Sequence, residues 1–398
     1  MSHLVRLELK EGLARHLRAG HPWVFKKALE QLPRIPAGSV VDLVDGGRFV
    51  ARGYYDPHSA IAVRVLTRDP GEAIDAAFWE RRVRGCHDAR AQLLDLTDTD
   101  AYRLIHGEGD ALPGVIVDRY GAHCVVKLYS AGLTPHRHLL VEALRKLPGL
   151  SGVIGRDEVG RDDADVDDEK GNGRVLWGEP APQPLTILER GAKFLVDVYA
   201  GQKTGFFLDQ RENRHLVRRL AKGREVLNCF CFSGGFSVNA ALGGAKSVFS
   251  VDQDADAIAL ARDNFALNGF EPAKSDFLAA DVFELLASFK KEGRTFDLVI
   301  LDPPAFAKSQ SAVEAAVAGY ASLNRQALAV LRPGGLLCTA SCSARVSPEA
   351  FFEAVKESAF KAGVDLALVD ERYQPADHPV RLQFREGRYL KFYVLHAR

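Results

Sequence analysis

Short apolar runs alternate with longer amphipathic segments through the second half of the chain. The apolar runs predict buried strands, and the segments with apolar residues three or four positions apart predict helices. The predicted strands are 225–230, 247–251, 297–301 and 335–340, and the predicted helices are 210–221, 236–242, 255–267, 282–290, 312–331 and 348–362. This alternation is typical of an α/β fold with a parallel sheet covered on both faces. Ligands bind beyond the carboxyl ends of the strands in such sheets, so functional residues should follow the strands.

The first half of the chain has a different pattern. Its first 68 residues hold short strand-like runs separated by Gly and Pro turns, which predicts a small β-barrel. The runs are 4–9, 40–44, 49–54 and 61–66. The following part mixes helical and strand patterns and predicts a small α+β domain. Its helices are expected at 72–98, with Ala76, Phe78, Val83, Leu93 and Leu94 on the apolar stripe, and at 138–146; its strands are expected at 115–117, 124–129 and 151–156.

Two further segments suggest where the domains end. The acidic tract at 162–169 is predicted to be a surface loop, and the proline-rich stretch at 180–184 is predicted to be a linker. A hairpin around Arg190-Gly191 then opens the last domain. The expected domains are therefore 1–70, 71–184 and 185–398.

Composition narrows the class of protein. The 398 residues are 47% hydrophobic and 26% charged with a net charge of zero, which is typical of a soluble globular protein. No apolar run is long enough for a membrane span, and the start of the chain has no signal-peptide core. The six cysteines have neither disulfide-framework nor zinc-site spacing, so we expect free thiols, no metal and a reducing, cytoplasmic setting.

The N-terminal 68 residues are locally basic, with eleven Lys and Arg against six Asp and Glu. Arg15, Arg18, Lys26 and Lys27 surround the aromatic pair Trp23 and Phe25. Basic and aromatic residues together can hold a phosphate backbone and stack a base. From residue types alone, the alternative that the two aromatic residues belong to the barrel core is favoured.

Two strand ends of the last domain carry residues suited to a nucleotide-like cofactor. The first predicted strand leads into Ser233-Gly234-Gly235, and glycines there let the backbone approach a ligand. Asp252 ends the second strand, where a carboxylate can bind ribose hydroxyls; a cap on the following helix is the alternative. Asp281 could bond an adenine amino group or cap the next helix, and both interpretations stay open.

The most specific motif is Asp302-Pro303-Pro304, which follows the apolar run Leu298–Leu301. The strand delivers Asp302 to the carboxyl edge of the sheet, and the two prolines fix an extended, rigid loop. The carboxylate and the loop carbonyls can accept hydrogen bonds from an amino group or a protonated ring nitrogen. We therefore expect a site for a planar, nitrogen-bearing ring.

Cys342 follows the next predicted strand, in the loop after Ala340. In isolation it could be a structural thiol or a nucleophile, but its position beside the Asp302 strand favours a nucleophile. Cys229 and Cys338 fall inside strand patterns and are expected to be buried.

Taken together, these motifs resemble those of the RlmI-type methyltransferases, which make 5-methylcytosine in large-subunit ribosomal RNA. The resemblance spans nearly the whole chain and rests on residues 201–211, the turn at 228–236, Asp302-Pro303-Pro304, Ser341-Cys342-Ser343 and Asp377-His378-Pro379. It implies a Rossmann-like class I methyltransferase domain, an N-terminal PUA β-barrel that binds RNA, and a central α+β domain. The RNA-binding barrel that it implies replaces the preference for Trp23 and Phe25 as core residues. Phe232 replaces the first glycine of the turn found in many methyltransferases, in keeping with this group.

The resemblance also implies a cofactor, S-adenosylmethionine, and a set of site residues. Cys342 and Asp302 are expected to be catalytic. The expected cofactor-binding residues are Lys203, Thr204, Phe230, Ser233, Gly234, Gly235, Asp252, Asp281, Asp302 and Pro303. The expected substrate-binding residues are Pro303, Pro304, Trp23 and Lys26.

Some questions stay open at the level of sequence. The Asp302 loop has no second cysteine to help release the product, and His378 is one candidate base for that step. Alternatives to carbon methylation are transfer to a base nitrogen and a non-catalytic RNA-binding assembly factor. The sequence names neither the target nucleotide nor the oligomeric state, and a homodimer is left open.

Overall fold

The computed structural model describes residues 4–156, 173–273, 276–307 and 309–398. The acidic tract at 162–169 lies outside the described residues. The chain divides into two compact units. Unit 1 comprises Met1–Ile187, Val196–Leu208 and Ala376–Gly387, and unit 2 comprises Leu188–Leu195, Asp209–Pro375 and Arg388–Arg398. The domain boundaries expected at residues 70 and 184 stay predictions.

Unit 1 begins with a five-stranded sheet in the order β1-β3-β4-β5-β2. Its strands are β1 (Val5–Glu8), β2 (Trp23–Phe25), β3 (Val40–Asp45), β4 (Arg48–Tyr55) and β5 (Ile61–Thr67), with the short helix α1 (Ala14–Arg18) between the first two. Strand β1 is parallel to β3 and the other pairs are antiparallel. An antiparallel bridge between Leu9 and Leu29 links the two ends of the sheet. The four expected strands are confirmed, whereas β2 and α1 are too short to be predicted.

A second five-stranded sheet, in the order β10-β9-β8-β7-β6, follows in unit 1. Its strands are β6 (Ala101–His106), β7 (Val115–Tyr120), β8 (His123–Leu128), β9 (Gly152–Gly155) and β10 (Arg174–Gly178). The helices α2 (Ala76–Leu93) and α3 (Arg137–Leu144) share its apolar core.

The predicted apolar stripe of α2 needs correction. The helix begins after Asp75, whose carboxylate accepts a hydrogen bond from the N–H of Phe78, so it is shorter than the expected 72–98. Ala76 and Leu93 are exposed, which makes their placement on the stripe wrong. Arg90 is buried there instead, because ion pairing offsets the cost of burying its charge.

The two-stranded hairpin at the start of the last domain is confirmed. It consists of β11 (Leu185–Glu189) and β12 (Ala192–Val196). Arg190 and Gly191 both have positive φ, 48° and 74°. Two consecutive residues with positive φ make the tight turn that suits the twist of a hairpin.

Unit 2 is built on a seven-stranded sheet in the order β15-β14-β13-β16-β17-β19-β18. Its strands are β13 (Glu225–Cys229), β14 (Ser247–Asp252), β15 (Phe277–Ala279), β16 (Phe296–Leu301), β17 (Leu331–Ser341), β18 (Leu366–Arg372) and β19 (Lys391–Ala397). Strands β13 to β17 are parallel, as predicted. Strand β19 runs antiparallel to both β17 and β18, a direction for which the sequence analysis made no prediction. A parallel connection needs a crossover, and residues 373–390 form only the short 3₁₀ turn Arg385–Gly387.

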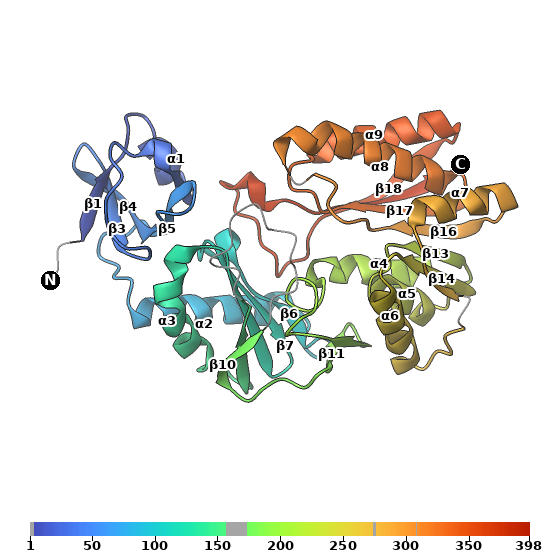
Figure 1. Cartoon of the computed structure of the whole chain (residues 1–398), viewed down its shortest axis with the longest axis horizontal. Helices are drawn as coiled ribbons and strands as arrows, with labels where there is room; N and C mark the ends of the chain where they lie inside the picture. The colour runs from blue at the N-terminus through green and yellow to red at the C-terminus, as the bar shows by residue number, and fades with distance from the viewer. Residues whose placement is uncertain (1–3, 157–172, 274–275, 308) are drawn as a thin grey trace. The chain divides into compact units, whose positions relative to one another are not determined.

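Helices cover both faces of this sheet (Figure 1). They are α4 (Arg211–Leu220), α5 (Gly235–Leu242), α6 (Ala255–Leu267), α7 (Val282–Glu292), α8 (Val313–Leu328) and α9 (Pro348–Ala362). Alternate residues of β16 enter two different cores: Leu298 and Ile300 pack with α4 and α5, whereas Val299 and Leu301 pack with α7, α8 and α9. Burial on both faces explains why the strand is apolar throughout.

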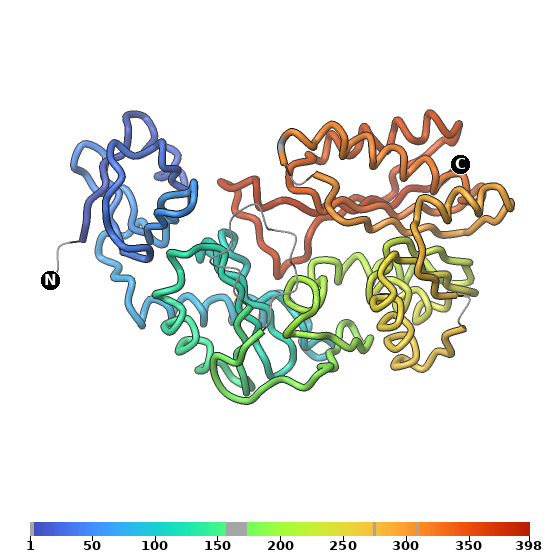
Figure 2. Tube along the Cα trace, viewed as in Figure 1, coloured from blue at the N-terminus to red at the C-terminus, as the bar shows by residue number. Residues whose placement is uncertain are grey.

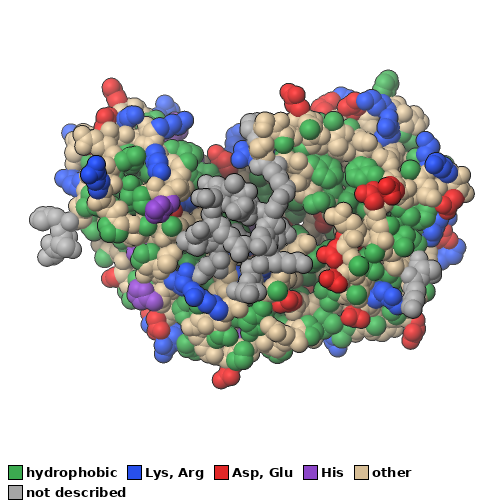
Figure 3. All heavy atoms as spheres, viewed as in Figure 1, with side chains coloured by type: hydrophobic (Ala, Val, Ile, Leu, Met, Phe, Trp, Pro, Cys, Tyr) green, Lys and Arg blue, Asp and Glu red, His purple; other side chains and the backbone are tan. Residues whose placement is uncertain are grey.

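The sheet order brings the predicted motifs to one edge. Strands β14, β13, β16 and β17 are consecutive neighbours and parallel, so the segments after their carboxyl ends lie at the same edge of the sheet. Figure 2 draws the course of the whole chain. Charged side chains of both signs are interspersed on the molecular face in Figure 3. Within the described residues, no helix combines the length and apolarity needed to cross a membrane.

Candidate active site

The turn between β13 and α5 has an unusual backbone. Three of its residues are left-handed, with φ of 58° at Phe230, 47° at Phe232 and 78° at Gly234. A non-glycine residue in this region costs about 1–3 kcal/mol and persists only where its surroundings hold it. The N–H of Phe232 donates to a carboxylate oxygen of Asp252 at 2.9 Å. This bond ties the strained turn to the end of the neighbouring strand.

The glycines of this turn allow close packing. A Cβ atom at Gly235 would lie 2.8 Å from Cδ of Arg214, and one at Gly234 would lie 3.0 Å from Cβ of Ala261. Ser233 Oγ is buried and has no hydrogen-bond partner among the described residues. Because buried hydroxyls normally have partners, this atom fits a site whose ligand completes the hydrogen bonding.

Asp252 and the helix cap after it are separate residues. One carboxylate oxygen of Asp252 binds the turn, and the other accepts a hydrogen bond from the N–H of Asp254 at 3.1 Å. Asp254 itself caps α6 through the N–H groups of Asp256 and Ala257. The capping alternative therefore belongs to Asp254, and the ribose-binding role of Asp252 stays a prediction.

Asp281 is the N-cap of α7. Its carboxylate accepts a hydrogen bond from the N–H of Glu284 at 3.0 Å, and its side chain is exposed. This is the capping geometry that the sequence left open. A contact with the adenine amino group stays a prediction.

Asp302 is held by residues at the start of α4. The amide Nε2 of Gln210 donates to Oδ1 of Asp302 at 2.8 Å, and Nδ2 of Asn213 donates to Oε1 of Gln210 at 2.6 Å. Because Asn213 occupies the carbonyl of Gln210, the amide group of Gln210 faces Asp302. The sequence assigned no role to Gln210 or Asn213, because the contact with Asp302 joins residues 92 positions apart in the chain.

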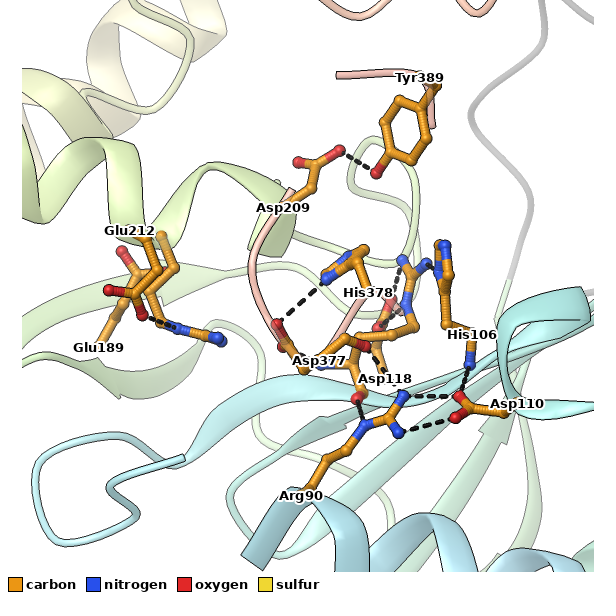
Figure 4. Close-up of polar contacts among 12 residues, drawn as sticks. Arg90, His106, Asp110, Asp118, Glu189, Asp209, Glu212, Asp377, His378 and Tyr389 are labelled. Atoms are coloured by element: carbon orange, nitrogen blue, oxygen red, sulfur yellow. Dashed lines mark hydrogen bonds and ion pairs between the residues drawn. The ribbon is translucent and has the colours of Figure 1, made fainter. Parts of the chain in front are cut away.

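A second contact fixes the same segment. The hydroxyl of Tyr389 donates to a carboxylate oxygen of Asp209 at 2.6 Å (Figure 4). Asp209 directly precedes Gln210. The C-terminal segment and the start of α4 are thus joined beside the Asp302 loop.

Cys342 lies directly after β17, and its Sγ is 4.0 Å from the carbonyl oxygen of Pro303. The structure therefore brings together the cysteine and the Asp-Pro-Pro loop, as the sequence predicted. Of the six cysteines in the chain, Cys342 alone is not buried. Burial raises the pKa of the thiols of Cys229 and Cys338, which keeps those two in the unreactive protonated form.

Lys203 and Thr204 lie in unit 1. The hydroxyl of Thr204 is buried and donates to Asp118 at 2.5 Å, and it also bonds the hydroxyl of Tyr120 at 2.9 Å. Lys203 has a φ of 54°, and its Nζ lies 4.5 Å from the centroid of the Phe207 ring. Their cofactor-binding roles stay predictions.

Trp23 and Phe25 are not core residues of the N-terminal sheet, so the core interpretation is wrong. Phe25 is 38% exposed, and neither residue is in the apolar cluster of this sheet. The indole Nε1 of Trp23 donates to Glu108 at 2.8 Å, and its ring packs edge-on against Phe384. Lys26 is half-buried in the short turn after β2. RNA contacts by Trp23 and Lys26 stay predictions.

His378 belongs to a buried polar cluster of unit 1 (Figure 4). Its Nδ1 lies 3.2 Å from a carboxylate oxygen of Asp377, and its ring is 4.9 Å from that of His106. Asp377 also accepts a hydrogen bond from the N–H of Arg103 at 2.9 Å. These contacts hold the His378 ring in place inside unit 1. Its role as the base that releases the product stays a prediction.

Comparison with known proteins places this geometry in a family. Residues 120–381 match the family model described as S-adenosylmethionine-dependent methyltransferase, and residues 7–68 match that of a PUA-like domain. A protein of Cronobacter sakazakii named ribosomal RNA large subunit methyltransferase I is 40% identical, over 99% of each chain. A protein of the same name from Shewanella denitrificans is 41% identical, over 97% of this chain and 98% of the relative. The chain belongs to the ribosomal RNA large subunit methyltransferase I family.

Solved structures agree with this family. A structure from Streptococcus mutans, described as a SAM-dependent methyltransferase, covers 99% of this chain and 100% of its own length, with a TM-score of 0.85 and 25% identity. The fold class predicted for the methyltransferase domain is confirmed, and so is the PUA-like module. S-adenosylmethionine is the cofactor of this methyltransferase, and the partnerless hydroxyl of Ser233 in the strained turn fits a ligand at that edge.

Proposed function

We propose that the chain methylates carbon 5 of cytosine in large-subunit ribosomal RNA and that Cys342 is the nucleophile. The names of the relatives support the RNA substrate. The position of Cys342 supports carbon 5 as the methyl acceptor. Its thiol is partly exposed and lies directly beside the Asp-Pro-Pro loop. This single observation carries the carbon-5 assignment.

The chemistry explains why a cysteine is needed. Carbon 5 of cytosine is a weak nucleophile, even toward a sulfonium methyl donor. Addition of the Cys342 thiolate at carbon 6 forms a carbon–sulfur bond and moves the ring π electrons toward carbon 5. Carbon 5 would then form a bond to the methyl group of the sulfonium donor, whose carbon–sulfur bond breaks to leave a neutral thioether. A base then removes the proton from carbon 5, the double bond re-forms, and the thiolate leaves.

The neighbouring residues orient the ring and stabilise its charge. Asp302 accepts a hydrogen bond from the exocyclic amino group and stabilises protonation at ring nitrogen 3. Gln210 fixes the Asp302 carboxylate through the 2.8 Å hydrogen bond. Asp252 and Ser233 hold the cofactor, and S-adenosylmethionine supplies an electrophilic methyl group when it is bound.

The N-terminal module provides the RNA-binding surface in this proposal. The rings of Trp23 and Phe25 lie outside the apolar core, and Lys26 and Lys27 follow them in the chain. Such residues bind a phosphate backbone and stack bases. A cytosine in structured RNA must leave its stack before Cys342 can attack its ring, at a cost of a few kcal/mol.

The test is methyl transfer by Cys342→Ala with radiolabelled cofactor and large-subunit ribosomal RNA. We expect no transfer above background and an unchanged affinity for S-adenosylmethionine, because the thiol belongs to the cytosine step. Cys86→Ala is the matched control, since Cys86 is buried in α2 and should leave the activity intact. Wild-type turnover by Cys342→Ala would sink the covalent scheme.

That outcome would favour a second candidate, transfer to a base nitrogen. The Asp302 carboxylate, oriented by Gln210, also suits an amino group or ring nitrogen as the acceptor. Mass analysis of the modified nucleoside separates the two, since only carbon-5 methylation gives 5-methylcytosine. Failure of the wild-type chain to bind S-adenosylmethionine would instead favour the non-catalytic assembly factor.

A further inference from the structure

Lys391 is a fully buried lysine at the start of β19 whose side chain contacts the segment that carries Cys342. Its exposed fraction is 0%. In the antiparallel ladder between β17 and β19, Lys391 is the direct partner of Ser341, the residue before Cys342. A buried lysine is rare unless its charge is compensated.

Three backbone carbonyls surround the Nζ atom of Lys391. It donates to the carbonyl oxygens of Ser343 at 2.7 Å, Tyr389 at 2.8 Å and Val346 at 2.9 Å. An ammonium group has three N–H donors, whereas a neutral amine has two. The three acceptors therefore match the charged form, and two of them hold the turn directly after Cys342.

The charge of Lys391 has no carboxylate partner. Among the described residues, Lys391 takes part in no ion pair, although carboxylates elsewhere in unit 2 pair with other cations. Burial lowers the pKa of Lys391 to about 8, and the ionised form of Cys342 opposes that fall. At neutral pH the lysine is thus a buried cation, and an ionised Cys342 favours its charged form.

Three other polar groups near the Cys342 turn are described, and each is neutral, exposed or part of the substrate site. The hydroxyl of Tyr320, from α8, bonds Ser343 Oγ at 3.0 Å, and burial raises the pKa of this tyrosine, so it stays uncharged. Asp302 precedes the proline whose carbonyl contacts the thiol. Arg345, on the same turn, is exposed, so water screens its charge. Lys391 is the buried cation among these groups.

We propose that Lys391 is a positioning residue that fixes the Cys342 turn and stabilises the thiolate of Cys342 by its buried positive charge. A nearby cation favours the ionised form of a thiol. The proton lost from sulfur goes to solvent, and the ammonium keeps its three carbonyl partners. The mechanistic use of this thiolate rests on the proposed function, but the charge coupling itself does not.

The test is alkylation of Cys342 by iodoacetamide at pH 5.5 to 10 in the full-length protein, followed by peptide mass spectrometry to read Cys342 alone. In the wild type, the midpoint of the pH dependence should lie below about 8.5, the value of an ordinary thiol. In Lys391→Met, it should rise by about one unit, and alkylation at pH 7 should slow about tenfold. Lys356→Met, an exposed lysine paired with Glu353 on α9, should match the wild type.

Two results would overturn this proposal. One is a wild-type midpoint at or above about 8.5, which decides the matter even if Lys391→Met does not fold. The other is an unchanged midpoint in a Lys391→Met protein that still binds S-adenosylmethionine. If the substitution only displaced the Cys342 turn, the alkylation rate of Cys342 would change at all pH values. The midpoint of its pH dependence would not move.

Methyl transfer separates this proposal from the proposed function. If both hold, Lys391→Met should lose turnover at pH 7 and recover part of it at pH 9, with an unchanged affinity for S-adenosylmethionine. Turnover by Cys342→Ala would remove the covalent mechanism but leave the alkylation result standing.

Discussion

The polar cluster around Asp377 in unit 1 and the Cys342 turn in unit 2 compensate positive charge in different ways. In unit 1, Arg90 binds both carboxylate oxygens of Asp110, at 2.8 and 2.6 Å, and Arg103 binds both oxygens of Asp118, at 2.5 and 3.1 Å (Figure 4). In unit 2, Lys391 is surrounded by three neutral carbonyls. A guanidinium paired with a carboxylate is locked in charge and geometry, whereas an ammonium held by dipoles can respond to a neighbour that ionises.

This difference distinguishes buried cations that stabilise the fold from a buried cation that acts on a reactive group. The arginine pairs join β6 and β7 to the segment around Asp377, since Arg90 also donates to the carbonyl of Asp377 at 2.9 Å. The lysine lies beside the one partly exposed thiol of the chain. We therefore expect substitutions in the first group to change mainly stability, and those in the second to change mainly reactivity.

The largest effect on stability is expected for Asp118→Asn. It replaces the fully buried carboxylate of Asp118, which pairs with the half-buried guanidinium of Arg103, and breaking a buried pair costs about 3–5 kcal/mol. The measurement is the free energy of unfolding of the full-length protein in urea. Glu142→Gln breaks an exposed pair with Arg145 and should cost less than about 1 kcal/mol. Equal losses in the two variants would contradict the structural role of the Asp118 pair.

A smaller loss of stability, about 2 kcal/mol, is expected for Lys391→Met. The substitution leaves carbonyls without donors, at about 1–3 kcal/mol each, but it also removes a buried charge whose desolvation opposes folding. Urea unfolding under the same conditions gives the comparison. A larger loss than that of Asp118→Asn would mean that Lys391 is as structural as the arginine pairs.

Gln210→Ala should reduce turnover about tenfold to a hundredfold, because a hydrogen bond to a charged group contributes about 1.5–3 kcal/mol. Its stability should fall by less than that of Asp118→Asn. Steady-state methyl transfer and urea unfolding together show the separation. Asn213→Ala, which removes the hydrogen bond that orients Gln210, should follow the same pattern more weakly. Normal turnover in both variants would show that Asp302 does not need Gln210 to orient it.

A further expected effect, about as large as the Lys391→Met loss itself, is the pH dependence of that loss. The folded pKa of Lys391 is lowered to about 8, below the unfolded value of about 10.4. Between these values the unfolded chain binds more protons, so wild-type stability gains with pH relative to the variant. The stability gap should therefore widen from pH 7 to pH 10, whereas that of Asp118→Asn should stay constant. A gap that narrows would contradict the lowered pKa.

Much of the fold was predictable because burial leaves a periodic pattern. Strand β16 is apolar at four consecutive positions, Leu298 to Leu301, since helices cover both of its faces. Short elements such as β15, with three residues, leave too few positions for a pattern. The antiparallel direction of β19 was not predictable either, because direction depends on the connection rather than on the composition of the strand.

Site residues could be predicted from the sequence where a chemically reactive or polar residue directly follows an apolar strand. Asp302 and Cys342 each follow an apolar strand, and strand order then brings them together. Gln210 and Lys391 were missed because their contacts come from segments far apart in the chain. In the sequence, Lys391 is an ordinary charged residue before an apolar strand, and only the three carbonyls around Nζ distinguish it.

The most direct test of the central claim is to trap the covalent intermediate. Large-subunit ribosomal RNA containing 5-fluorocytidine is incubated with the full-length protein and S-adenosylmethionine. Fluorine at carbon 5 cannot leave as a proton does, so the adduct should accumulate, and peptide mass spectrometry should find the RNA fragment on Cys342. Cys342→Ala should give no adduct. Methylation of normal RNA by the wild type without any adduct on Cys342 would contradict the account.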